Sequence, residues 1–195
     1  DTLTFRYMGR RGLQLRNEAR YLTPDYKGYS FIEYMPEDQV EGRSDAAALR
    51  QVRLLAAQWA LQAEQPAQAL QQLDAASRGR PELLLRSQAL LRLGQAAQAS
   101  GPLELWLSQH PQDASAWQLL AQAWQQQGQV LRSVRAEAEA RAAHYDWAAA
   151  IDRLRAGQAL ARSQPHVAQD HIEASIIDTR LRVFESRFRE QAAQR

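Results

Sequence analysis

The sequence contains no cysteine. This absence excludes a disulfide framework, a thiolate zinc site and a thiol nucleophile, although it fits a cytoplasmic and a periplasmic location equally. Long hydrophobic runs are also missing, because no stretch stays apolar for the ~18 residues that a membrane-spanning helix needs. Charge of one sign is not in excess, since 24 basic residues face 22 acidic ones and the formal net charge is +2. Such a balance is not typical of nucleic-acid-binding proteins, and we expect no nucleic acid partner.

What the chain does contain is enough apolar residues, 45% of 195, to bury a sizeable core. The pattern of these residues changes near Arg43 and Ser44. Before this point apolar residues alternate with a period of two, and after it they follow a helical period. We therefore divide the chain into residues 1–43 and residues 44–195, and we expect that the two parts do not share one core.

The first part has the pattern of short β-strands. Residues 2–8 alternate, and Gly9-Arg10-Arg11-Gly12 is typical of the tight turn that follows a strand. Residues 13–22 alternate again, and residues 29–35 form an aromatic-rich third run after a turn-forming segment. The pattern predicts an antiparallel β-hairpin or a three-stranded meander with one buried face. A piece of a transmembrane barrel has the same alternation and is the alternative.

Short sequence patterns in this part carry a resemblance to a known family. They are RYMGRRGLQL at 6–15, RYLTP at 20–24 and EYMPED at 33–38. Together they resemble the first barrel strands of the lipopolysaccharide-assembly outer-membrane protein family LptD, over residues 1 to about 43 only. The resemblance implies a fragment similar to a client rather than a working transporter, because three strands cannot close a barrel and leave unpaired edges. Another chain or the helical part would have to cover these edges.

Residues 44–195 contain internal repeats. QPAQAL at 65–70 returns as QAAQAS at 95–100, an offset of 30, and Gly94 returns as Gly128, an offset of 34. Thirty-four residues is the length of a tetratricopeptide unit, and its spacing of large and small residues resembles that of Trp117, Leu120, Ala121, Trp124 and Gly128. This resemblance implies stacked pairs of antiparallel helices. The expected fold class is mainly all-α, a tetratricopeptide helical-hairpin solenoid behind an N-terminal antiparallel β segment.

The same pattern gives expectations for the aromatic residues. All five tryptophans lie in the helical part, and the repeat places Trp117 and Trp124 at core positions. We expect the tryptophans to be structural rather than an exposed stacking platform. A final amphipathic helix is expected to begin near Asp170, capped by its carboxylate and by Glu173. Its arginines are expected on the solvated face, opposite an apolar stripe formed by Ile177, Leu181, Phe184 and Phe188.

A second resemblance concerns the end of the chain. AEARAAHYDWAAAIDRL at 138–154 and ASIIDTRLR at 174–182 resemble the carboxy-terminal tetratricopeptide domain of BepA-like periplasmic zinc metallopeptidases. That family is associated with quality control of outer-membrane barrels, LptD among them. Its protease domain carries an HExxH zinc motif, which this sequence lacks. The resemblance implies a location in the periplasm of a Gram-negative bacterium, at the outer membrane. It also implies unfolded barrel proteins and the barrel-assembly machinery as partners.

No residue pattern in the chain predicts catalysis. His166, Asp170, His171 and Glu173 form the best candidate for a metal cluster, but the spacing of five between the histidines favours ordinary surface residues. A Gly-rich phosphate loop and a nucleophile elbow are absent from the sequence. We therefore expect no enzyme, no catalytic residue, no metal site and no cofactor.

The repeats also predict a peptide-binding surface. Tetratricopeptide stacks usually present the first helix of each unit on a concave face, and alignment of the repeats gives equivalent inward positions. The predicted groove consists of Gln58, Gln62, Gln88, Arg92, Gln118, Gln122 and Gln126. A column of amides can donate to and accept from the backbone of an extended peptide without selecting its side chains. The alternative is that glutamine merely keeps a helical surface soluble.

These observations lead to one interpretation of the whole chain: a non-catalytic protein-interaction module for quality control or assembly of outer-membrane barrel proteins. A client-like strand segment in front of it looks like an engineered fusion, in which the linker at 37–44 raises the effective concentration of the client. The strands of two chains could also pair, which would make the protein self-associate. Three alternatives stay open: a fragment of an LptD-like barrel or lipopolysaccharide transport protein, the accessory domain of a zinc metallopeptidase whose catalytic domain is absent, and a cytoplasmic tetratricopeptide adaptor.

Overall fold

The computed structural model describes residues 2–7, 13–18, 46–74, 77, 79–163 and 171–194. The described part of the chain is mainly helical, as the sequence predicts. It divides into two compact units, Asp1–Ala56 and Ala57–Arg195. The predicted boundary at residues 43 and 44 therefore lies some residues before the division between the units.

The first unit contains a β-hairpin and the beginning of helix α1 (Ala46–Gln62). Strands β1 (Thr2–Tyr7) and β2 (Leu13–Glu18) are antiparallel, with Phe5 opposite Leu15 and Tyr7 opposite Leu13. The hairpin predicted for these residues is confirmed. The third predicted strand at 29–35 and the linker at 37–44 lie outside the described residues.

Short helical hairpins begin the second unit. Helix α1 is followed in the sequence by α2 (Pro66–Gln72). Helix α3 (Arg80–Arg92) is followed by α4 (Ala96–Gln109). Proline stands in the first turn of α2 and of α3, where the missing N–H is not needed for the helix. Gly94, between α3 and α4, has a left-handed backbone with φ of 71°, which permits the tight turn.

The second unit continues with four more helices. They are α5 (Ala114–Gln126), α6 (Val130–Ala143), α7 (Trp147–Ser163) and α8 (His171–Ala193). Gly128, between α5 and α6, has φ of 73° and repeats the conformation of Gly94, 34 residues earlier. Glu64 stands 30 residues before Gly94 and is also left-handed, with φ of 57°. The two offsets read from the sequence are thus repeated in the backbone.

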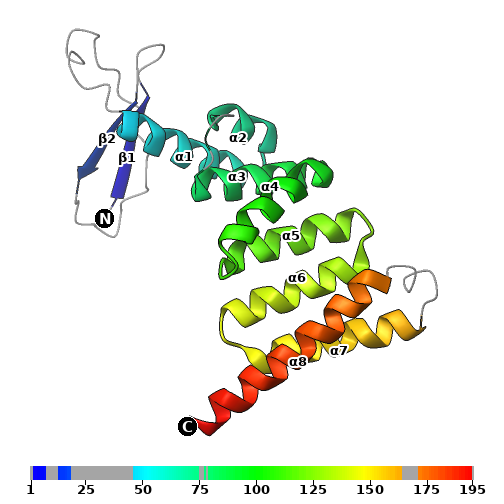
Figure 1. Ribbon diagram of the computed structural model, residues 1–195. Helices are drawn as coiled ribbons and strands as arrows, with labels where there is room; N and C mark the ends of the chain where they lie inside the picture. Colours follow the sequence, from blue (N-terminus) through cyan, green and yellow to red (C-terminus); the bar gives the residue numbers. More distant parts are fainter. Residues whose placement is uncertain are drawn as a thin grey trace, which may run out of the picture. The chain divides into compact units, whose positions relative to one another are not determined.

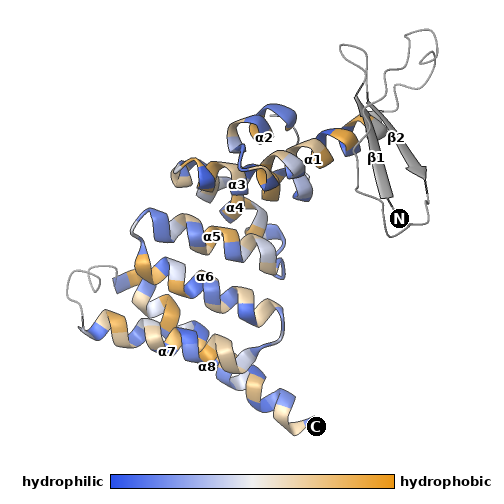
Figure 2. Ribbon diagram, turned by 180° about the vertical axis from the view of Figure 1, so that it is seen from behind, coloured by the Kyte–Doolittle hydropathy of each residue, from blue (hydrophilic) through white to orange (hydrophobic). Residues whose placement is uncertain are grey.

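The helices of the second unit follow one another as layers (Figure 1). Consecutive helices from α2 to α8 are in contact, α3 also contacts α5, and α6 also contacts α8. Apolar and polar residues alternate along the helices, which is visible as mixed colours along the ribbons in Figure 2. One core cluster is formed by α3 to α6 around Leu103 and Leu120, and a second by α6 to α8 around Leu154 and Ile177.

The tryptophans test the predicted core positions. Trp124 is buried, and Trp117 and Trp106 pack against the first core cluster, while Trp147 packs against the second. The structural role predicted for them is confirmed. Trp59 contradicts the prediction, because 67% of its surface is exposed. Its repeat equivalents, 30 and 64 residues further on, are the fully buried Ala89 and Ala123, so the exposure of this position differs between the first hairpin and the later ones.

Helix α8 is amphipathic, but its polar side differs from the expectation. Ile177, Leu181 and Phe184 are buried as predicted, whereas Phe188, which was predicted to belong to the same apolar stripe, is exposed. Arg180 was expected on the solvated face, whereas its guanidinium forms two hydrogen bonds, at 2.5 and 2.6 Å, with the buried carboxylate of Glu139 in α6. Within the described residues, no helix combines the length and hydropathy that crossing a bilayer requires.

Candidate protein-binding surface

The predicted groove residues lie on α1, α3 and α5. Gln58 and Gln122 are exposed and Gln88 is half-buried. Gln88 and Gln122 belong to helices α3 and α5, which are in direct contact, so their amides lie on neighbouring layers of the stack. Gln62 and Gln118 are exposed as well. Whether these side chains bind a peptide stays a prediction.

Two of the predicted groove residues have another partner. The guanidinium of Arg92 donates a hydrogen bond to the backbone carbonyl of Leu61, and the side-chain amide of Gln126 donates one of 3.2 Å to the carbonyl of Leu91. Each acceptor lies in the last turn of the first helix of the preceding hairpin, and each also accepts a backbone N–H from the turn that follows, from Glu64 at Leu61 and from Gly94 at Leu91. Equivalent residues of two repeats therefore link consecutive hairpins, a role that the sequence analysis did not assign.

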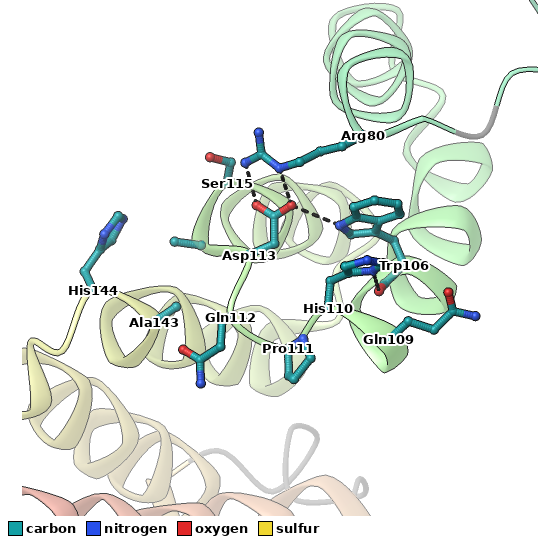
Figure 3. Close-up of a pocket in the computed structure, with 11 residues that line it drawn as sticks. Arg80, Trp106, Gln109, His110, Pro111, Gln112, Asp113, Ser115, Ala143 and His144 are labelled. Carbon is teal, nitrogen blue, oxygen red and sulfur yellow. Dashed lines mark hydrogen bonds and ion pairs between the residues drawn. The ribbon is translucent and has the colours of Figure 1, made fainter.

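A depression of about 610 Å³ lies where the α4–α5 turn meets the ends of α3 and α6. Its centre is Asp113, whose carboxylate accepts two hydrogen bonds from Arg80, at 2.6 and 2.8 Å, and one of 2.9 Å from the indole N–H of Trp106 (Figure 3). Asp113 also caps α5 by accepting from the backbone N–H of Ala116 at 3.3 Å. The arrangement joins three helices through one carboxylate.

The ionisation of this pair follows from its contacts. The hydrogen bonds from Arg80, and then those from Trp106 and the backbone of Ala116, lower the pKa of Asp113 despite its partial burial. The hydrogen bond to Asp113 raises the pKa of Arg80. An aspartate that stays ionised and fully hydrogen-bonded is a poor general acid or base near neutral pH, so the geometry suits a structural joint.

Two histidines face the same depression. The ring of His110 stacks on Trp106, with 3.8 Å between the centroids and 9° between the planes. His144 lies at the opposite side of the depression (Figure 3). In the part of the chain that the structure describes, no three histidine, cysteine or acidic side chains come together as a metal site would require. Of the metal cluster considered from sequence, His171 is exposed and Glu173 is buried, while His166 and Asp170 lie outside the described residues, as does the predicted cap of α8.

A cluster of charged and aromatic side chains joins α5, α6 and α8, and the sequence analysis missed it. Glu173 is buried to 3% exposure and forms ion pairs with Arg135 and, at 3.9 Å, with Arg132. The guanidinium of Arg135 lies 5.3 Å from the ring centre of Trp124 and 6.0 Å from that of Trp117. Periodicity does place Glu173 on the core side of α8, but only the fold shows which cations it meets.

The comparisons with known proteins concern a short part of the chain. No family model matches it. LPS-assembly protein LptD from Aromatoleum aromaticum is 53% identical over 45 residues, which are 23% of this chain and 6% of that protein. LptD proteins from Pseudoalteromonas atlantica and Pseudoalteromonas translucida are 57% and 54% identical over 37 residues. The chain thus covers about one twentieth of the length of these relatives, and a short LptD-like segment is what they have in common with it.

Proposed function

We propose that the protein is a non-catalytic module that holds segments of outer-membrane barrel proteins, in the periplasm of a Gram-negative bacterium and at the outer membrane. The observation that carries this proposal is the joining of an LptD-like segment of about 40 residues to a stack of helical hairpins in one chain. A segment of this kind presents unpaired strand edges, and a stack of hairpins offers a long surface to bind them.

The helical unit is proposed to be a tetratricopeptide solenoid like that of BepA-type proteins. Two features support this assignment. Glu64, Gly94 and Gly128 share a left-handed turn conformation at offsets of 30 and 34 residues, and Arg92 and Gln126 make the same kind of bond to the preceding hairpin. Both are features of a repeated unit in which each hairpin packs on its neighbour.

Recognition is proposed to use the glutamines that are not engaged between hairpins. The amides of Gln58, Gln88 and Gln122 can each donate to and accept from a peptide backbone. An extended segment with unpaired N–H and C=O groups would satisfy them without a fixed side-chain sequence. Arg92 and Gln126 hold the layers at the spacing that such a column needs, and unpaired strands of two chains could in addition associate with each other.

Photo-crosslinking tests this proposal. A photo-reactive residue replaces Gln88 or Gln122 in the full chain, and a matched one replaces Gln98, which is exposed on α4, the second helix of its hairpin. Urea-denatured LptD barrel precursor is diluted into each variant and irradiated. We expect adducts from Gln88 and Gln122 and few from Gln98. Equal capture of the precursor at all three positions would contradict the proposal that Gln58, Gln88 and Gln122 form the binding surface.

A second candidate function follows from the comparisons. The identity of 51 to 57% over 37 to 45 residues favours a fragment related to LptD itself, with the helices as an accessory part. In that case residues 1–43 would insert with other barrel strands. Sedimentation of the purified chain with and without detergent separates the two candidates, since a module for binding clients is monodisperse without detergent and a barrel fragment is not.

A further inference from the structure

The contact between α6 and α8 contains two ion pairs of opposite polarity. In one, Arg135 and Arg132 of α6 face Glu173 of α8. In the other, Glu139 of α6 faces Arg180 of α8. Both acidic side chains are buried, whereas the arginines keep part of their surface in solvent. A buried ion pair gives little net stability compared with an apolar contact, so its presence calls for another explanation.

The cationic side of the first ion pair is built without α8. Trp117 and Trp124 come from α5, and Arg132 and Arg135 come from α6. Arg132 lies 6.0 Å from the ring centre of Trp124, and Arg135 lies near both indoles. Aromatic faces hold a guanidinium in place by cation–π contact, and its N–H groups, which point outward in the plane of the guanidinium, are suited to bind a carboxylate. We call these four residues the indole–arginine site. Their arrangement does not depend on α8, so the site is suited to bind a carboxylate even when Glu173 is not in it.

The first turn of α8 is held to the stack by that carboxylate and by Ala174, which packs against the second core cluster. Ile172 is 77% exposed and Ile176 is partly exposed, so neither anchors the turn in the core. Ala174 is only partly buried, and full burial of apolar residues begins at Ile177 and continues at Leu181 and Phe184. Release of the first turn would thus break the ion pairs of Glu173 and leave most of the apolar contact of α8 in place.

We infer that the indole–arginine site binds acidic side chains of other polypeptides, and that Glu173 occupies it as an internal ligand. A partner carboxylate displaces the first turn of α8 and takes over the hydrogen bonds of Arg135. Because Glu173 is attached to the site, its effective concentration is high, and only a partner that is itself held nearby competes well. The inference does not depend on the glutamine column and survives if that column binds nothing.

The second ion pair supplies the matched control. Arg180→Ala removes a cation from α8 and weakens the attachment of the helix, but it vacates no carboxylate site. Glu173→Ala weakens the same attachment and empties the indole–arginine site. The two variants therefore separate general loosening of α8 from access to the arginines.

The test uses the full chain and two blocked pentapeptides. One copies residues 171–175, His-Ile-Glu-Ala-Ser, and the other has glutamine in place of glutamate. Binding is followed through the indole N–H resonances of Trp117 and Trp124. We expect the acidic peptide to bind the Glu173→Ala chain roughly tenfold more tightly than the wild type or the Arg180→Ala chain. Adding Arg135→Ala should abolish the gain. Equal binding of the acidic and amide peptides would overturn the inference.

A measurement on the wild type covers the case in which the Glu173→Ala chain does not fold. Amide hydrogen exchange of residues 171–176 is recorded with each pentapeptide in large excess. Competition by the acidic peptide should speed exchange in this turn and leave residues 181–184 unchanged, while the amide peptide has no effect. An exchange rate of residues 171–176 that does not change with the acidic peptide, or that rises equally with both peptides, would contradict the inference.

Discussion

The side-chain amide of Gln126 donates a hydrogen bond of 3.2 Å to the backbone carbonyl of Leu91, 35 residues earlier in the chain. One hairpin earlier, Arg92 makes the same contact with the carbonyl of Leu61. The first helix of each hairpin is thus tied to the end of the first helix before it. Residues that looked like peptide contacts in the sequence act, at two of three repeats, between the layers of the protein itself.

Removal of the Gln126 contact should destabilise the stack. Gln126→Ala leaves the carbonyl of Leu91 without this donor and is expected to cost about 1 kcal/mol of unfolding free energy. Gln122→Ala, four residues earlier on the same helix, should change it by less than about 0.5 kcal/mol, since that side chain is exposed. Urea denaturation measures both. An equal effect of the two substitutions would mean that the hydrogen bond contributes nothing specific.

Gly157 permits the close packing of α7. A Cβ added there would lie 2.9 Å from Cγ1 of Val134 in α6 and 3.4 Å from Cδ1 of Ile177 in α8. Valine in a helix has little freedom to move aside, so Gly157→Ala should cost about 1 to 2 kcal/mol despite its better helix propensity. At Gly101 in α4 a Cβ meets nothing within 4 Å. Gly101→Ala should instead raise the melting temperature, and a rise in both variants would refute the packing argument.

The left-handed turns at Gly128 and Glu64 are equivalent positions at which we expect substitutions to have opposite effects on stability. Gly128 has φ of 73°, so Gly128→Ala should cost about 1 to 2 kcal/mol. Glu64 adopts φ of 57° with a side chain, so Glu64→Gly should stabilise by about 0.5 to 1 kcal/mol. Thermal denaturation of both variants checks this. Destabilisation by Glu64→Gly would show that the glutamate side chain has a role that outweighs its backbone cost.

Asp113 should give the protein a pH-dependent stability. Its folded-state pKa lies below the ordinary value of about 3.9, so its contribution is present above that pH and is lost as the pH falls through the lowered pKa. Asp113→Asn is expected to cost about 1 to 2 kcal/mol at pH 7, and the difference from wild type should shrink below pH ~4.

Chemical denaturation at a series of pH values measures this difference. Asp152→Asn is the control, because the side chain of Asp152 is exposed and its carboxylate forms no hydrogen bond or ion pair within the described residues. A loss of stability in the Asp113→Asn chain that stays constant down to pH ~3 would contradict the assignment.

Local patterns were sufficient to predict the elements. Alternation identified β1 and β2, and the spacing of Gly94 and Gly128 gave the length of the repeated unit. Trp124 and Trp117 were correctly predicted to lie in or against a core, because an internal hairpin is covered on both sides. Trp59 shows the limit of this reasoning, since it is exposed although its repeat equivalents, Ala89 and Ala123, are buried.

Contacts between distant residues could not be predicted in the same way. The pairing of Arg135 with Glu173, and of Arg180 with Glu139, depends on how α8 packs against α6. The residue type alone does not indicate whether a glutamine side chain binds a peptide, a neighbouring helix or water. The sequence therefore could not distinguish the role of Gln126 from that of Gln122. The direction of a side chain relative to the next layer decides between these roles.

The central claim is that the helical stack binds the backbone of an extended chain rather than its side chains. The most direct test is calorimetric titration of the full chain with three peptides: one copying residues 2–18, one with the same residues in scrambled order, and one N-methylated at alternate residues. We expect scrambling to change the Kd by less than about threefold and N-methylation to weaken binding by about tenfold or more, since N-methylation removes backbone donors. Binding that survives N-methylation and fails on scrambling would contradict it.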